Sequence, residues 1–484
     1  MKPRAIPTAI FAALLIALVA AMSLRPPGLR AQDFSHPNEG TTTRPAPQTA
    51  LIQQANDALS SGDYAGALKI LTSINTQLPN NPQVLYNLGI ALDALSDAAP
   101  SSSSTAPEAA GSASNPSAPA TAEAAYRASI AADAKFPPPH IALGLLLARS
   151  GQFADARAQF NAALALPDLA PALKARALRA LARLEFTGDP AHSQPPNLSA
   201  ASSNLLAALQ LSPEQPDDIL LSAQIAEATP DFPSAETAFR RYLALPGNAN
   251  DPAATAALAH ILLAQHKPAD AEALLLPAHD AQPANPAFTA QLAQAWLDSG
   301  DAAKTARAVP MVESLHTANP TNPAVTRLLA RIYVTTGHSD QADPLYASLV
   351  NGQLNPDPTL ITDYADLLIR QHRPAEAEKL LNLALAKPHS YPTPADLADA
   401  ALHLAFAAQD IDDPKTTLQA LALSATVQPP SPPALFLEAT ADEALHQSSQ
   451  AVEAYKKFLA SSAGKYPEQE SQARQRLVLL QHAK

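Results

Sequence analysis

The chain has 484 residues and a formal net charge of −12, which disfavours a surface built to bind phosphates, so we expect no nucleic acid among its partners. Cysteine is absent, which excludes disulfides, thiolate metal sites and a cysteine nucleophile. Aromatic residues make up 5% and the hydrophobic class 47%, so alanine and leucine dominate and favour closely packed helices.

The first 47 residues resemble a targeting segment followed by a tether. Lys2 and Arg4 precede an apolar run over residues 9–24, which is short for a membrane-spanning helix of ~20 residues. We expect residues 1–31 to be a cleaved secretory signal peptide, with an uncleaved inner-membrane anchor over 9–24, or a buried helix, as the alternatives. Export would place the rest of the chain in the periplasm or outside the cell. Residues 32–47 are rich in proline and threonine and predict a flexible tether.

From residue 48 onward, apolar residues recur at helical spacing in pairs of short segments. A small residue in the first segment of each pair recurs at intervals of 34 to 40 residues. The exception is the interval from Gly144 to Ala223, which is about twice as long and contains one degenerate copy. These small residues are Gly144, Ala223, Ala259, Ala293, Ala330, Ala365, Ala405 and Ala439. The pattern is interrupted by a Ser/Ala/Pro insert at about 97–120, expected to be disordered, and by a loop at about 188–198. Residues 467–484 predict a closing helix.

The copy from Pro137 to Asp168 shows the pattern most completely. It combines Gly144 in the first helix, Gly151 at the turn and Phe160 in the second helix. This closely resembles the tetratricopeptide repeat (TPR), an antiparallel helix pair of ~34 residues. The resemblance implies an all-α, TPR-like α-solenoid over residues 48–466. It would be a right-handed superhelix of about eleven antiparallel pairs, ending in the C-terminal capping helix.

The residues at the predicted helix starts and turns can be explained physically. Five first helices are predicted to start at an Asn or Asp N-cap followed by proline, which gives up an amide that would be unpaired anyway. The turns within pairs carry glycine, or a His-basic-Pro sequence in two copies. The N-cap residues are Asn81, Asp251, Asn285, Asn322 and Asp357; the turn residues are Gly62, Gly151, Gly300, Gly337, His266 and His372.

The resemblance implies an inner groove, lined by first helices, that binds a partner protein or peptide. Positions 2, 5, 9 and 12 of each copy, counted from its opening proline, should face inward. Arg327 and Arg331 occupy two such positions one helical turn apart, and we hypothesise that they meet a partner carboxylate. The alternative is that they pair with Asp366 or face solvent. The further groove candidates are Gln224, His260, Gln294 and Asp366.

The sequence contains no phosphate-binding glycine loop, nucleophile elbow or zinc-ligand motif. We therefore expect a non-enzymatic scaffold with no catalytic residues, cofactor or metal. Trp296 is expected to pack in the core, and the Asp410–Pro414 segment to cap a helix. An accessory role in polysaccharide export or envelope assembly is the alternative function. The sequence sets neither the identity of the partner nor the oligomeric state.

Overall fold

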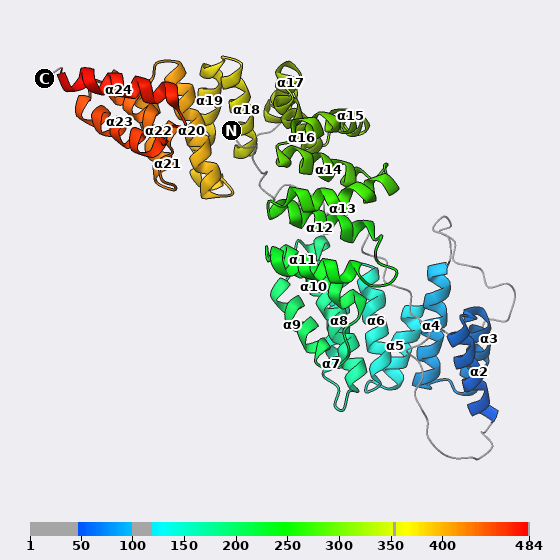
Figure 1. Ribbon diagram of the computed structural model, residues 1–484. Coiled ribbons are helices and arrows are strands. Elements are labelled where there is room, and N and C mark those ends of the chain that lie inside the picture. Colours follow the sequence, from blue (N-terminus) through cyan, green and yellow to red (C-terminus); the bar gives the residue numbers. More distant parts are fainter. Residues whose placement is uncertain (1–46, 99–118, 352–354, 483–484) are drawn as a thin grey trace. The chain divides into compact units, whose positions relative to one another are not determined.

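The computed structural model describes residues 47–98, 119–351 and 355–482, and these residues form α-helices without β-strands (Figure 1). The helices alternate between a first and a second member of eleven pairs within the described ranges. The first helices are α2 (Pro47–Ser61), α4 (Pro82–Ala98), α6 (Pro137–Arg149), α8 (Pro171–Thr187), α10 (Pro216–Ala228), α12 (Pro252–Ala264), α14 (Pro286–Ser299), α16 (Pro323–Thr335), α18 (Pro358–Arg370), α20 (Pro394–Asp410) and α22 (Pro432–Ala444).

Each first helix is followed along the chain by its partner. The second helices are α3 (Tyr64–Gln77), α5 (Ala122–Ala132), α7 (Phe153–Leu164), α9 (Leu198–Leu209), α11 (Phe232–Leu243), α13 (Pro268–Ala281), α15 (Ala302–Ala318), α17 (Ser339–Asn351), α19 (Pro374–Leu385), α21 (Pro414–Ala425) and α23 (Ser448–Ser462). Helix α24 (Pro467–His482) closes the series. The all-α, TPR-like solenoid predicted from the sequence is therefore confirmed.

The helices begin and end at the residues predicted as helix starts and turns. All eleven first helices begin at a proline, including those without an Asn or Asp before it. The five predicted N-caps each accept a hydrogen bond from a backbone amide in the first turn. The four turn glycines have φ between +71° and +82°, and His266 and His372 occupy the same left-handed region at +58° and +59°. Asp413 caps α21, as expected for the Asp410–Pro414 segment.

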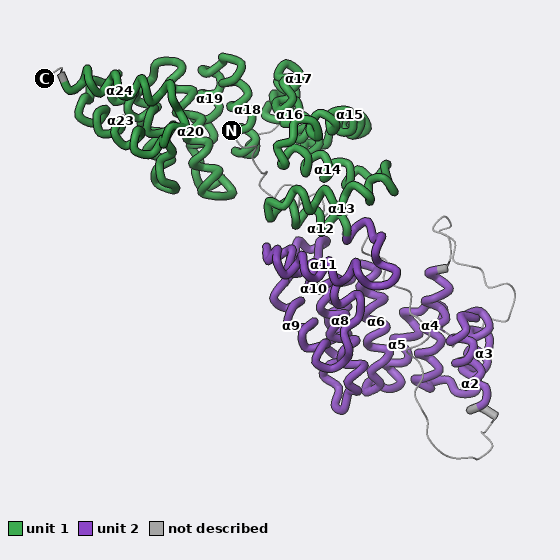
Figure 2. The backbone as a smooth tube through the Cα atoms, in the orientation of Figure 1, with its two compact units in different colours: residues 1–15, 255–484 green, residues 16–254 purple. Residues whose placement is uncertain are grey.

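The chain divides into two compact units, one covering residues 16–254 and the other mainly 255–484 (Figure 2). In the first of these, here called unit 2, the ring of Phe160 in α7 lies directly on Gly144 of α6, and Tyr126 of α5 lies on Gly89 of α4. In unit 1, covering 255–484, Trp296 is buried, donates a hydrogen bond to Glu272 at 3.0 Å and stacks under Arg307. In the α6–α7 and α4–α5 pairs, the two helices thus pack through a glycine on one helix and an aromatic ring on the other.

Several predicted segments fall outside the described residues. These are the signal peptide or anchor over 1–31, the tether over 32–46, and most of the insert, since residues 99–118 are not described. Within the described ranges no helix has both the length and the apolar character needed to cross a membrane.

The loop after α8 depends on Gly188, which ends that helix with φ 70° and ψ −160°. A Cβ atom there would lie 2.6 Å from the carbonyl oxygen of Gln194, whose backbone pairs with that of Asp189. We expect Gly188→Ala to destabilise unit 2 by about 2 kcal/mol, because both the backbone region and the contact exclude a side chain. Hydrogen exchange of the amides in α8 and α9 measures the loss. Gly151→Ala is the control, since its φ is +77° with nothing within 4 Å, and we expect about 1 kcal/mol. Equal losses would show that the Gln194 contact does not matter.

Candidate functional site

The first helices form the inner layer of each unit. Several successive first helices touch one another, as α6 and α8 do in unit 2 and α18 and α20 in unit 1. Successive second helices make no comparable contacts in the described part of the chain. The layer of first helices is therefore the more tightly curved one. We call the side of the first helices that faces away from the second helices the inner surface.

Burial separates the two layers in the same way. Helix α14 buries every residue from Phe288 to Leu297, whereas α7 buries only Ala156, Phe160 and Ala163. Helix α18, for example, is covered by its partner α19 and by the first helices α16 and α20, so even its inner positions are shielded. Polar side chains at those positions must therefore find partners within the chain or be met by a ligand.

Arg327 finds its partners within the chain. Its Nε and Nη2 atoms both donate to Asp363 of α18, at 2.9 and 2.6 Å. Its Nη1 donates to Asp357 at 3.0 Å, and Nη2 also to Thr359 at 3.0 Å. With only 6% of its surface exposed, Arg327 joins α16 to α18. Arg327 therefore pairs with acids of its own chain other than the expected Asp366, and a contact with a partner carboxylate stays a prediction.

Arg331 lies one turn further along α16 but faces the other neighbour. Its positive charge acts on Asp298 of α14, whose pKa is nevertheless raised because burial is the larger effect. Gln294 donates a hydrogen bond to the same carboxylate at 2.7 Å. Gln294 and Arg331 are thus brought together around Asp298, a residue that the sequence analysis did not single out.

Asp366 accepts hydrogen bonds from two sides. Arg370 donates to it from one turn along α18 at 2.9 Å, and Nε2 of His403 in α20 lies 3.4 Å away. Burial opposes ionisation of this carboxyl, but His403 and Arg370 outweigh burial and hold its pKa below the ordinary value. The side chain of Arg370 remains 49% exposed, so this pair is accessible on the inner surface.

The two remaining candidates lie elsewhere. His260 in α12 is 5% exposed, and burial lowers its pKa, so its imidazole is held neutral. Gln224 lies in α10 of unit 2 and is half-buried, one turn before Glu227. The structure therefore groups Gln294 with Arg331, and Asp366 with His403, but it does not assemble the six candidates into one site. Whether they bind a partner stays a prediction.

A half-buried arginine in unit 2 makes contacts similar to those of Arg327. Arg179 of α8 makes an ion pair with Asp218 in the first turn of α10 at 2.8 Å and donates to the carbonyl oxygen of Pro213 at 2.9 Å. Within unit 2, α9 and α10 contact each other only sparsely, and within unit 1 so do α17 and α18. Each arginine bridges the first helices across that sparse junction. We call these two clusters the arginine joints.

The described residues contain no group of three or more His, Asp or Glu side chains placed to hold a metal ion. No family model matches the chain, and no curated protein matches its sequence. Solved structures with similar folds include the TPR domain of P58(IPK), at 15% identity and a TM-score of 0.33, covering 90% of this chain and 98% of that one. Cut9 in its complex with Hcn1 has 12% identity and a TM-score of 0.42, covering 90% and 84%. Yeast Tom70 has 12% and 0.36, covering 90% and 96%.

Proposed function

We propose that this chain is a non-enzymatic scaffold that binds a partner protein or peptide along the inner surface of its first helices. Within each unit the described pairs present their first helices in series, so an extended segment could cross several of them. A solenoid of this kind presents a long surface rather than a single pocket. The fold itself does not fix what is bound.

The observation that carries the proposal is the set of charged side chains that stay accessible on this surface. Asp366 and Arg370 in unit 1 have 25% and 49% of their side chains exposed. Arg183 and Asp217 form a 2.8 Å pair in unit 2 with 44% and 38% exposed. Accessible charges at separate first helices would let a partner segment exchange hydrogen bonds at several steps.

We further propose that the scaffold works outside the cytoplasm, in the cell envelope. The support is the signal-like sequence over residues 1–31, which would either be removed or leave the helix pairs tethered to a membrane through residues 9–24. Fractionation of the native host would locate the protein.

Site-specific photo-crosslinking tests the surface. A photoreactive amino acid at Gln224 or Arg370, on first helices, should capture a partner of the same mass in the native host. The controls are Leu206 and Leu383, which are 60% and 66% exposed on the second helices α9 and α19. Capture from the two control positions, with none from the inner positions, would contradict the proposal.

A further inference from the structure

Glu227 differs from the other acidic residues on the first helices of unit 2. It lies in the last turn of α10, at an inner position, half-buried and one turn after Gln224. Neither side chain makes a hydrogen bond or ion pair within the described residues. Two polar groups thus stand next to each other on the inner surface without a hydrogen-bond partner among the described residues.

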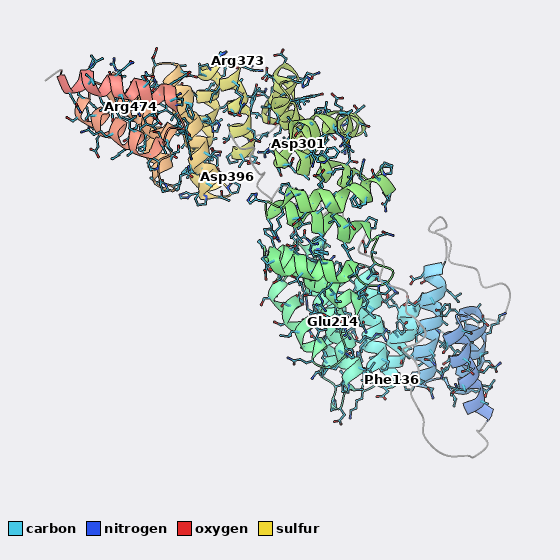
Figure 3. The ribbon with its side chains drawn as sticks, viewed as in Figure 1. Phe136, Glu214, Asp301, Arg373, Asp396 and Arg474 are labelled. Carbon is cyan, nitrogen blue, oxygen red and sulfur yellow. The ribbon has the colours of Figure 1, made fainter. Side chains whose placement is uncertain are left out.

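The cations on the helices packed against α10 are committed to other carboxylates. In α8, Arg179 pairs with Asp218 and Arg183 with Asp217, both at 2.8 Å. In α11, Arg240 pairs with Glu236 at 3.0 Å, and Arg241 pairs with Glu214, labelled in Figure 3, at 2.6 Å. Helix α9 carries no charged residue.

Two further cations on α8 lie at the wrong end of that helix. Lys174 and Arg176 precede Arg179, and Arg179 is level with the first turn of α10 because it contacts Asp218 there. Glu227 is in the last turn. The other acids near α10 are also engaged, since Glu185 pairs with Arg157 and Asp231 caps α11. Glu227 is therefore left without a neutralising charge.

This arrangement has an energetic consequence. Burial alone raises the pKa of Glu227 to about 7, and no neighbouring charge offsets it. At neutral pH the chain therefore holds a partly ionised carboxylate that it does not stabilise. An uncompensated group of this kind on a binding surface is a candidate for compensation by a ligand.

We propose that Glu227 and Gln224 form a subsite that binds a lysine or arginine side chain of a partner segment lying on the inner surface of unit 2. The inference rests on the proposed function. The Glu227 carboxylate would accept hydrogen bonds from the cationic head group. The side-chain amide oxygen of Gln224, one helical turn away, would accept another. A bare metal ion would find only these two ligand groups, and an anionic ligand would be repelled.

Selection of phage-displayed random dodecapeptides against the immobilised full chain tests the subsite. We expect the wild type to enrich peptides with Lys or Arg at one fixed register position. Glu227→Gln should still select peptides but lose that enrichment. Asp155→Asn is the matched control, because Asp155 is exposed on the second helix α7 and its substitution removes the same charge elsewhere in unit 2.

A selected peptide should also bind with a characteristic pH dependence. The carboxyl is about one-tenth ionised at pH 6 and about nine-tenths at pH 8, so we expect roughly tenfold tighter binding to the wild type at pH 8. Binding to Glu227→Gln should not change in this way. Circular dichroism at both pH values checks that the variant is folded.

The outcomes separate the two proposals. If the wild type selects no peptides at all, the proposed function fails, and this inference with it. If peptides are selected without a fixed Lys or Arg, or with the same preference by Glu227→Gln, the subsite is overturned while the scaffold proposal stands.

Discussion

Replacing Arg327 by alanine is expected to destabilise the α16–α18 region of unit 1 by about 3–5 kcal/mol. The substitution would leave Asp357 and Asp363 without the cation that both of them contact, in a place that is only partly open to water. It would also leave Thr359 without its donor. Because α17 and α18 contact each other only sparsely, little other packing would compensate at this junction.

Hydrogen exchange followed by mass spectrometry would measure the loss, since unfolding of a repeat array need not be two-state. Amides in α16 and α18 should lose protection, while those in unit 2 should not. Arg127→Ala is the control, because Arg127 pairs with Glu123 on the surface of α5, and we expect a loss below about 0.5 kcal/mol. A loss at Arg327 as small as at Arg127 would show that the joint does not hold the helices together.

A paired substitution separates lost charge from lost packing. Arg327→Met with Asp363→Leu replaces the closest ion pair by apolar side chains of similar size. It should recover part of the stability lost by Arg327→Met alone, because an unpaired buried charge costs more than an absent pair. No recovery would mean that the guanidinium acts mainly through Asp357 and Thr359.

The sequence was sufficient to predict the repeats because their signals are local. A proline opening each first helix, Asn285 or Asn322 before it, and Gly151 at a turn all act within a few residues along the chain. Even the replacement of glycine by His266 and His372 could be anticipated, since the following proline fixes where the next helix starts. Such signals do not depend on how neighbouring pairs pack.

The candidate site was less predictable because it depends on register between first helices. Arg327 and Arg331 lie one turn apart on α16, and spacing alone places them on one surface. In the structure, Arg327 contacts Asp363 on α18, which lies 36 residues later in the chain. Arg331 instead lies near Asp298 on α14, 33 residues earlier. Counted from Pro171, Arg179 stands at position 9 of its copy and is expected to face inward, but its spacing does not reveal that it pairs with Asp218 on α10. Nothing in the local sequence marks either arginine joint.

The second large effect is expected at the contact between α6 and α7, where Gly144→Val should cost unit 2 about 3 kcal/mol. A Cβ at Gly144 would lie 2.5 Å from Cε1 and 2.8 Å from Cδ1 of Phe160, which is itself fully buried and has no space to move into. Helix propensity acts in the opposite direction, because valine is a better helix former than glycine by a few tenths of a kcal/mol. The sign of the change therefore distinguishes the two effects.

Hydrogen exchange of the amides in α6 and α7, measured for Gly144→Val, for Phe160→Ala and for the double variant, would complete a cycle. Phe160→Ala alone should cost about 3–5 kcal/mol through the cavity it leaves. If the valine occupies part of that cavity, the double variant should lose at least 1 kcal/mol less than the sum of the single losses. The control is Ala154→Val on the exposed side of α7, where only helix propensity changes and we expect about 0.5 kcal/mol. Additive losses at Gly144 and Phe160 would mean that the two residues do not pack against each other. The small-against-large contact would then not be what holds a helix pair together, because Gly144 and Phe160 belong to the copy in which the repeat pattern is most complete.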